Sequence, residues 1–160
     1  MKIHDISIPL APMMPVYPGD PTVSIVPMKQ IAQGDAANVS QLSFGNHTGT
    51  HLDPPIHFIP GGKTVDQLDL NTLYGPALVV DMTHVEHAIT ANDLERAKLS
   101  KRAVRILFRT RNSNLWERPD FEKDFVGLAW DAAQWLVDRG VKAIVVACNI
   151  LVTGFGLIRR

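Results

Sequence analysis

The amino-acid sequence predicts one α/β domain with a β-rich N-terminal section. From residue 77 to residue 147, strand-like and helix-like segments alternate, which is the element order of an α/β domain. Before residue 50, short stretches of alternating polarity follow turn signals rich in proline and glycine. The chain has 160 residues, 46% of them hydrophobic, a size and composition that allow one compact core. We therefore expect residues 1–160 to form a single domain.

The N-terminal section contains three candidate strands. Ile6 and Ile8 alternate with polar neighbours, and the run Val23–Val26 follows the turn signal at residues 18–21. Residues 41–45 also alternate between apolar and polar or small side chains. We expect the third segment to be a half-buried strand that leads directly into the histidine-rich segment.

The middle of the chain predicts a strand and a short helix. After the turn at residues 60–62, the apolar run Ala77–Val80 indicates a buried strand. Thr90 is followed three residues later by Asp93, which resembles a capping box. A short helix through Lys98 should follow.

The C-terminal third predicts strand, helix and strand. Val104–Phe108 has the composition of a strand, and residues 141–147 return to an apolar strand pattern. Between them, apolar side chains share one helical face, and Gly140 takes the position where a helix commonly ends. The side chains on that face are Leu128, Ala132, Trp135 and Leu136.

Composition excludes several classes of partner. Sixteen basic side chains balance sixteen acidic ones, so no overall field would recruit nucleic acid or an anionic membrane. Cys148 is the only cysteine, which excludes an internal disulfide and fits a reducing compartment. Asp5 interrupts any signal-peptide core, and Val141–Leu151 is far too short to span a membrane. We expect a soluble cytoplasmic protein whose partners are small molecules or copies of itself.

One segment concentrates the residues that carry chemistry. His47, His51, Asp53 and His57 occupy odd positions, so an extended backbone would project all four towards one side. Gly49, the threonines and Pro54-Pro55 disfavour a helix here. The prolines should end the strand near Asp53 and leave His57 to return from a turn. Any one of these histidines alone would be an ordinary core or surface residue, but together they indicate a site.

The donor set fits a divalent metal. Two imidazoles and a carboxylate, from His47, His51 and Asp53, suit zinc and are tolerable for manganese or iron. Three protein ligands leave a coordination position open, and water bound there can have its pKa lowered to about 7. His57 is then the candidate for moving a proton between that water and a leaving amine.

The segment His47–Phe58 resembles the H-x-G-T-H-x-D-x-P-x-H-F signature of the cyclase family, which includes bacterial kynurenine formamidase and isatin hydrolase. Further similar stretches lie throughout most of the chain, at residues 16–20, 107–110, 127–128, 132–136 and 139–142. The resemblance implies a swivelling β/β/α-type fold. It also implies a homodimer or larger oligomer in which a neighbouring subunit helps to close the active site.

The resemblance further implies a role for five residues. His47, His51 and Asp53 would be the metal ligands, and His57 the catalytic acid and base. Tyr17 matches an aromatic residue that lines the substrate pocket in relatives, although the residue by itself would be an ordinary aromatic in a loop rich in proline and glycine. The substrate would be a small amide, either an aryl formamide such as N-formylkynurenine or a cyclic amide.

The C-terminal part departs from the family pattern. Relatives continue with a segment that supplies a histidine and a glutamate to the metal site, whereas here no histidine follows His87 and Asn149 stands near the expected aspartate. We therefore expect the C-terminal part of the domain to be incomplete and its activity to be impaired. The alternative to a hydrolase is a metal-binding but catalytically impaired family member that acts as a binding or assembly partner.

Four other features are weaker candidates for a site. His84 and His87 flank Glu86 and could form a second metal site, but a solvated loop explains them better. The other three are a glycine pair at Thr153–Gly156 without the pattern of a phosphate loop, the apolar surroundings of Cys148, and an arginine pair, Arg109 and Arg111, at a strand end. We assign no site role to these three.

Overall fold

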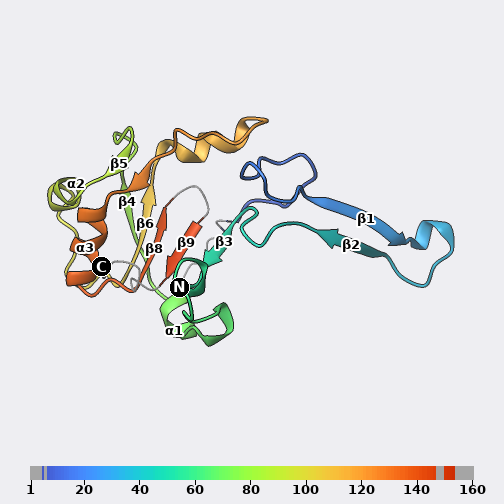
Figure 1. Cartoon of the computed structure of the whole chain (residues 1–160), viewed down its shortest axis with the longest axis horizontal. Coiled ribbons are helices and arrows are strands. Elements are labelled where there is room, and N and C mark those ends of the chain that lie inside the picture. The colour runs from blue at the N-terminus through green and yellow to red at the C-terminus, as the bar shows by residue number, and fades with distance from the viewer. Residues whose placement is uncertain (1–4, 6, 147–149, 154–160) are drawn as a thin grey trace.

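The computed structural model describes residues 5, 7–146 and 150–153, and its fold is mixed α/β, as the sequence predicts. A five-stranded sheet lies at its centre, and a long two-stranded arm extends away from it (Figure 1). Neighbouring strands are parallel, except that β8 and β9 are antiparallel. In spatial order, the strands are β3 (His51–Asp53), β9 (Ile150–Thr153), β8 (Ala143–Val146), β6 (Arg105–Arg109) and β4 (Leu78–Asp81).

The hydrophobic core lies between this sheet and two helices, α2 (Ala91–Arg96) and α3 (Trp130–Asp138). Ile106 and Phe108 of β6 are almost fully buried there, which follows from their position in the interior of a sheet covered by helices. The predicted capping box of α2 is present, because Thr90 and Asp93 bond reciprocally at its N-terminus. The helix ends at Arg96, two residues before the predicted end.

The predicted face of α3 is mostly confirmed. Ala132 and Leu136 are fully buried, and Trp135 packs against the core. Gly140 adopts a φ of 73° just beyond the helix, the left-handed conformation that favours glycine after a C-terminus. Leu128 was wrongly placed on this face, because it belongs to β7 (Gly127–Leu128), which pairs with β5 (Ala88–Ile89).

Strand β4 differs from the prediction of a buried strand. Val80 is buried against the core, but Val79 is 62% exposed. β4 stands at one edge of the sheet and only one of its faces is covered, so its side chains alternate between core and solvent. A run of apolar residues alone does not reveal whether both faces of a strand are covered.

The arm consists of β1 (Ser24–Lys29) and β2 (Val39–Ser43), paired antiparallel with an irregularity between Pro27 and Lys29. Every residue of both strands is exposed, so the predicted half-buried strand at residues 41–45 is wrong about burial. The strand predicted around Ile6 and Ile8 is also absent at Ser7 and Ile8, while Ile6 lies outside the described residues. The N-terminal section is β-rich mainly through this arm.

Short helical turns connect the strands. They are η1 (Ile31–Gln33), η2 (Pro55–His57), η3 (Val65–Gln67), α1 (Leu70–Leu73) and η4 (Arg111–Glu117). Cys148, Asn149 and residues 154–156 lie outside the described residues. Within the described part of the chain, no helix is long and apolar enough to cross a membrane.

Candidate metal centre

Three different local structures carry the four predicted site residues of the histidine-rich segment. His51 and Asp53 lie on β3, His57 ends η2, and His47 lies in a turn before β3. The prediction that one extended strand carries His47 is therefore wrong, whereas the turn predicted before His57 is confirmed. Gly49 explains the difference: its φ is 66°, and a Cβ there would lie 2.9 Å from Leu10 Cδ2. This residue lets the chain turn tightly between the two histidines.

The nitrogen and oxygen donors of His47, His51 and Asp53 converge. One donor atom from each residue lies within 4.8 Å of the other two. Asp53 Oδ1 is 2.8 Å from His47 Nδ1 and 3.4 Å from His51 Nε2. Tetrahedral ligands about 2.0–2.2 Å from one ion lie roughly 3.3–3.6 Å apart. The two distances to Asp53 lie near this range, so the donor set fits a single divalent ion after small side-chain movements.

Neighbouring polar groups orient the two imidazoles. His51 Nδ1 lies 2.7 Å from the Gly49 carbonyl oxygen, so an Nδ1–H donates there and Nε2 is the nitrogen that faces Asp53. His47 Nε2 lies 3.1 Å from Asn46 Nδ2, on the side of the ring away from Asp53. His51 is thus held by an acceptor behind its ring, as the histidine ligands of metal sites commonly are, whereas the Asn46 amide N–H donates to the His47 ring.

Hydrogen bonds and nearby charges shift the pKa values of Asp53 and His51. Burial acts to raise the pKa of Asp53, but the hydrogen bond from His51 and the charges of the surrounding histidines outweigh it and lower that pKa. Burial acts to lower the pKa of His51, and its hydrogen bonds with Asp53 and Gly49 outweigh that effect and raise it. Each shift favours the charged form of the residue concerned.

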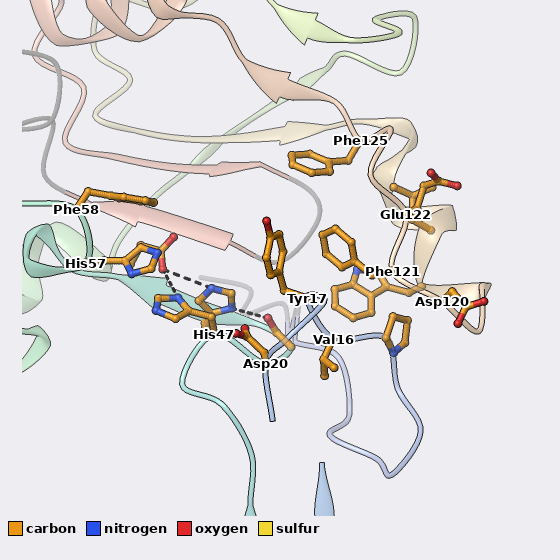
Figure 2. Close-up of a pocket in the computed structure, with 16 residues that line it drawn as sticks. Val16, Tyr17, Asp20, His47, His57, Phe58, Asp120, Phe121, Glu122 and Phe125 are labelled. Atoms are coloured by element: carbon orange, nitrogen blue, oxygen red, sulfur yellow. Dashed lines mark hydrogen bonds and ion pairs between the residues drawn. The ribbon is translucent and has the colours of Figure 1, made fainter. Parts of the chain in front are cut away.

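His57 lies beside the cluster but outside the donor triad. Its ring centroid is 3.8 Å from that of His47, with 32° between the planes, and 4.0 Å from the ring of Phe58. Figure 2 shows His57 and His47 together on one side of a cavity. His57 is therefore close enough to exchange protons with a group held at the donor atoms, without being one of them.

The cavity above the donors has a volume of about 570 Å³, enough for a small organic molecule. Tyr17 lies on its opposite side, with its ring edge-on to Phe121 at 5.3 Å between centroids (Figure 2). Tyr17 thus lines the cavity, while its role in binding substrate stays a prediction. Asp20, Asp120 and Glu122 also line the cavity, and Arg118 pairs with Glu122.

Sequence reasoning missed most of the wall around Tyr17. Residues 113–125 contribute six of the lining residues: Leu115, Trp116, Asp120, Phe121, Glu122 and Phe125. Their only signal in the sequence is three aromatic residues in a segment that is otherwise polar and rich in charge. The pattern does not reveal which site such a loop faces, because tertiary contacts place it there.

The weaker candidates do not assemble a second site in the described part of the chain. His84 and His87 take no part in a group of metal donors there, and His87 Nδ1 instead lies 3.6 Å from Asp124 Oδ1. Arg111 binds backbone oxygens of Glu86 and Asp124, and Arg109 lies 3.4 Å from Asp81. Both arginines thus have structural partners.

Comparison with known proteins places this geometry in a family. The profile of the family described as Putative cyclase matches residues 4–148. Cyclase-like protein 1 of Arabidopsis thaliana is 36% identical over 147 residues, which cover 86% of this chain and 57% of that protein. Kynurenine formamidase of Erythrobacter litoralis (strain HTCC2594) is 32% identical over 143 residues, 89% of this chain and 64% of the relative.

Solved structures are similar as well. A potential metal-dependent hydrolase with cyclase activity superposes with a TM-score of 0.73 at 27% identity, covering 94% of this chain and 79% of the other. Isatin hydrolase A from Ralstonia solanacearum gives a TM-score of 0.72 at 26% identity over 89% and 65% of the two chains. The chain spans about half the length of the curated relatives it matches. Its sequence and its fold both show that this chain belongs to the cyclase family.

Proposed function

We propose that this chain is a metal-dependent hydrolase of small amides, with an aryl formamide such as N-formylkynurenine or a cyclic amide as substrate. The observation that carries the proposal is the convergence of donors from His47, His51 and Asp53 at the base of a cavity with an aromatic wall. Relatives named kynurenine formamidase and isatin hydrolase support the same chemistry.

The metal would be zinc, with manganese as the alternative, since two imidazoles and one carboxylate suit both ions. When bound, such an ion supplies Lewis acidity and lowers the pKa of water at its open position. His47, His51 and Asp53 would hold it, and the Gly49 carbonyl would keep the His51 ring in orientation through its bond with Nδ1.

His57 would serve as the acid and base. Its ring lies against His47, within reach of a water above the donors. In hydrolysis the imidazole takes a proton as the water oxygen bonds to the amide carbonyl carbon. It then gives that proton to the nitrogen as the carbon–nitrogen bond breaks. The products are a carboxylic acid and a free amine; a cyclic amide opens to one molecule that carries both groups.

The opposite wall would receive the rest of the substrate. Tyr17, Phe121 and Phe125 present aromatic surfaces to the cavity, and a planar aryl group can stack edge-on or offset against them. Such contacts exclude water around the reacting carbonyl and orient it above the donors. The geometry thus favours an amide attached to a ring over an extended peptide.

Assembly and location complete the proposal. A homodimer or larger homo-oligomer would cover the exposed arm of β1 and β2, because an isolated two-stranded hairpin is only marginally stable. We assign no nucleic-acid or membrane partner, in keeping with the balanced charge. The proposed location is the cytoplasm.

A metal-supplemented assay tests the function. The protein is loaded with zinc or manganese, its metal content is measured, and the same sample is assayed on formanilide, N-formylkynurenine, lactams and lactones. Metal-dependent turnover of the aryl formamides or lactams that is lost in His51→Ala, but kept in His84→Ala, supports the proposal. His84 is an exposed histidine outside the cavity and so controls for the substitution itself. A protein that holds metal in stoichiometric amount but turns over none of these substrates would support the alternative, a metal-binding but catalytically impaired family member.

A further inference from the structure

One segment forms much of the cavity wall opposite the donor triad, beside Tyr17. This segment, residues 113–125, is named the wall loop; it comprises the last five residues of η4 and the stretch up to the residue before Val126. Six of its side chains line the cavity. Figure 2 shows Phe121, Glu122 and Phe125 across the cavity from His47 and His57. The width of the cavity thus depends on where the two ends of this loop are held.

One side chain closes the loop at its base. Asn112 Nδ2 donates to the Val126 carbonyl at 2.9 Å, and Asn112 Oδ1 accepts from the Val126 N–H at 2.7 Å. Asn112 and Val126 are both fully buried. The side-chain amide therefore satisfies both backbone groups of Val126, as a neighbouring strand would do.

The backbone of Asn112 is held in turn. Its N–H donates to the Thr110 hydroxyl at 3.3 Å, at the start of η4 and directly after β6. Val126 packs in the hydrophobic core on the other side of the loop. The Asn112–Val126 pair therefore connects the two ends of the wall loop to the end of β6 and to the hydrophobic core.

A second set of contacts, more exposed to solvent, also holds the wall loop beside the Asn112–Val126 pair. The Arg111 guanidinium donates to the Glu86 carbonyl and to the Asp124 carbonyl, both at 2.9 Å, and pairs with the Asp124 carboxylate at 3.0 Å. The Arg111 side chain is 31% exposed, so salt and solvent weaken its charge interaction. The hydrogen bonds between Asn112 and Val126, in contrast, are fully buried.

We propose that Asn112 is a positioning residue that sets the wall loop against the donor triad and thereby determines how tightly the site binds the ring of an aryl substrate. The nature of that substrate rests on the proposed function. Asn112 does not line the cavity, so it acts through Trp116, Phe121 and Phe125. Gln is too long and Ala too short to reach both backbone groups of Val126, and an ionised Asp keeps the acceptor but loses the donor.

Asn112→Asp is the sharpest variant, because it preserves the size of the side chain and, when ionised, replaces the donor to the Val126 carbonyl with a carboxylate oxygen that repels it. Leu94→Ala is the matched control: it weakens the same core from α2 and contributes nothing to the cavity. Both variants are compared well below their melting temperatures, so that each sample remains folded. Metal content should stay unchanged in both, since neither residue touches the donors.

Two readouts do not depend on turnover. Hydrogen–deuterium exchange of residues 113–125 should accelerate at least about tenfold in Asn112→Asp and stay as in wild type in Leu94→Ala. Acetophenone, which has a ring and a carbonyl but no bond to hydrolyse, should bind the zinc-loaded Asn112→Asp protein about tenfold more weakly than wild type. Wherever aryl formamides are turned over, the variant should raise KM with kcat nearly unchanged, because ring contacts hold ground state and transition state alike.

Equal exchange of residues 113–125 in wild type and Asn112→Asp would overturn the proposal. Acetophenone binding that does not differ between the two proteins, including no binding to either, would overturn it as well. If Leu94→Ala changed exchange and acetophenone binding as much as Asn112→Asp does, Asn112 would act only as an ordinary core residue. That result would also refute the proposal. The absence of amide hydrolysis in every sample would instead count against the proposed function alone, because exchange and acetophenone binding are measured without turnover.

Discussion

The imidazole rings of His47 and His57 lie almost face to face, 3.8 Å apart between centroids and inclined by 32°. They come from different local structures, a turn before β3 and the end of η2. One ring has a nitrogen 2.8 Å from Asp53, and the other lies outside the donor group. Under the proposed function, His47 would help to hold the ion and His57 would move a proton, and the two roles can be tested apart.

His57→Ala should keep the metal and lose turnover. The donors of His47, His51 and Asp53 remain in place, while the group that moves the proton is removed. General acid–base catalysis contributes about 10²–10⁴-fold to rate, so kcat should fall by that order. Metal content and kcat measured on one sample check this. Equal activity in the variant would remove His57 from the mechanism.

Removal of the metal should destabilise the fold. An ion that binds only the native state stabilises it by about 2.7 kcal/mol at a free concentration 100 times its Kd, or roughly 5–10 °C in Tm for a chain of this size. Chelation should lower Tm and added zinc should restore it. Asp53→Asn, which keeps the shape but removes the anionic donor, should show a Tm that responds to neither treatment.

The exposed arm should mediate self-association. Ile25 and Leu42 lie directly opposite each other on its two strands and are 37% and 57% exposed. Leu42→Lys should shift the protein towards monomers in light scattering, because a charge on an apolar contact surface is costly to bury. Val65→Lys is the control, since Val65 is an exposed apolar residue outside the arm. A wild-type protein that is monomeric at working concentration would contradict the assembly proposed here.

The capping box of α2 should make stability depend on pH in acid. Hydrogen bonds from the Thr90 hydroxyl and then from its backbone N–H lower the pKa of Asp93. A carboxyl whose pKa is lower in the folded state stabilises the fold above its unfolded pKa of about 3.9, and this contribution is lost as pH falls through the folded value.

Thr90→Ala should therefore cost about 0.5–2 kcal/mol at neutral pH. Its deficit in urea unfolding should shrink as pH is lowered below about 4, because the wild type then loses the Asp93 interaction too. A deficit that stays constant from pH 7 to pH 3 would show that the Asp93 carboxylate contributes nothing to the cap.

The elements that the sequence predicted correctly depend on local chemistry. The capping residues Thr90 and Asp93 lie three positions apart, and Gly140 marks the end of α3 through its own backbone preference. The donor types at His47, His51 and Asp53 could likewise be identified from one short segment. Their assignment as metal ligands stays a prediction.

What the sequence did not predict depends on contacts between distant segments. The extended backbone predicted at His47 was wrong because Gly49 takes a positive φ. The wall loop was missed because Asn112 and Val126, fourteen positions apart, bring its ends together. Val79 was assigned to the interior because a continuous apolar run does not show which strand stands at the edge of a sheet.

The order of strands in the central sheet determines how the donor strand is connected to the rest of the sheet. β3, which carries His51 and Asp53, is paired with β9, and β9 with β8. Among the residues whose burial is described, the strand members of the hydrophobic cluster under α2 and α3 come from β4, β6 and β8. Within the sheet, backbone pairing therefore connects β3 to β8 through one intervening strand. Separation of β9 from β8 would break the pairing that joins the donor strand to the rest of the sheet, a local, sub-global opening.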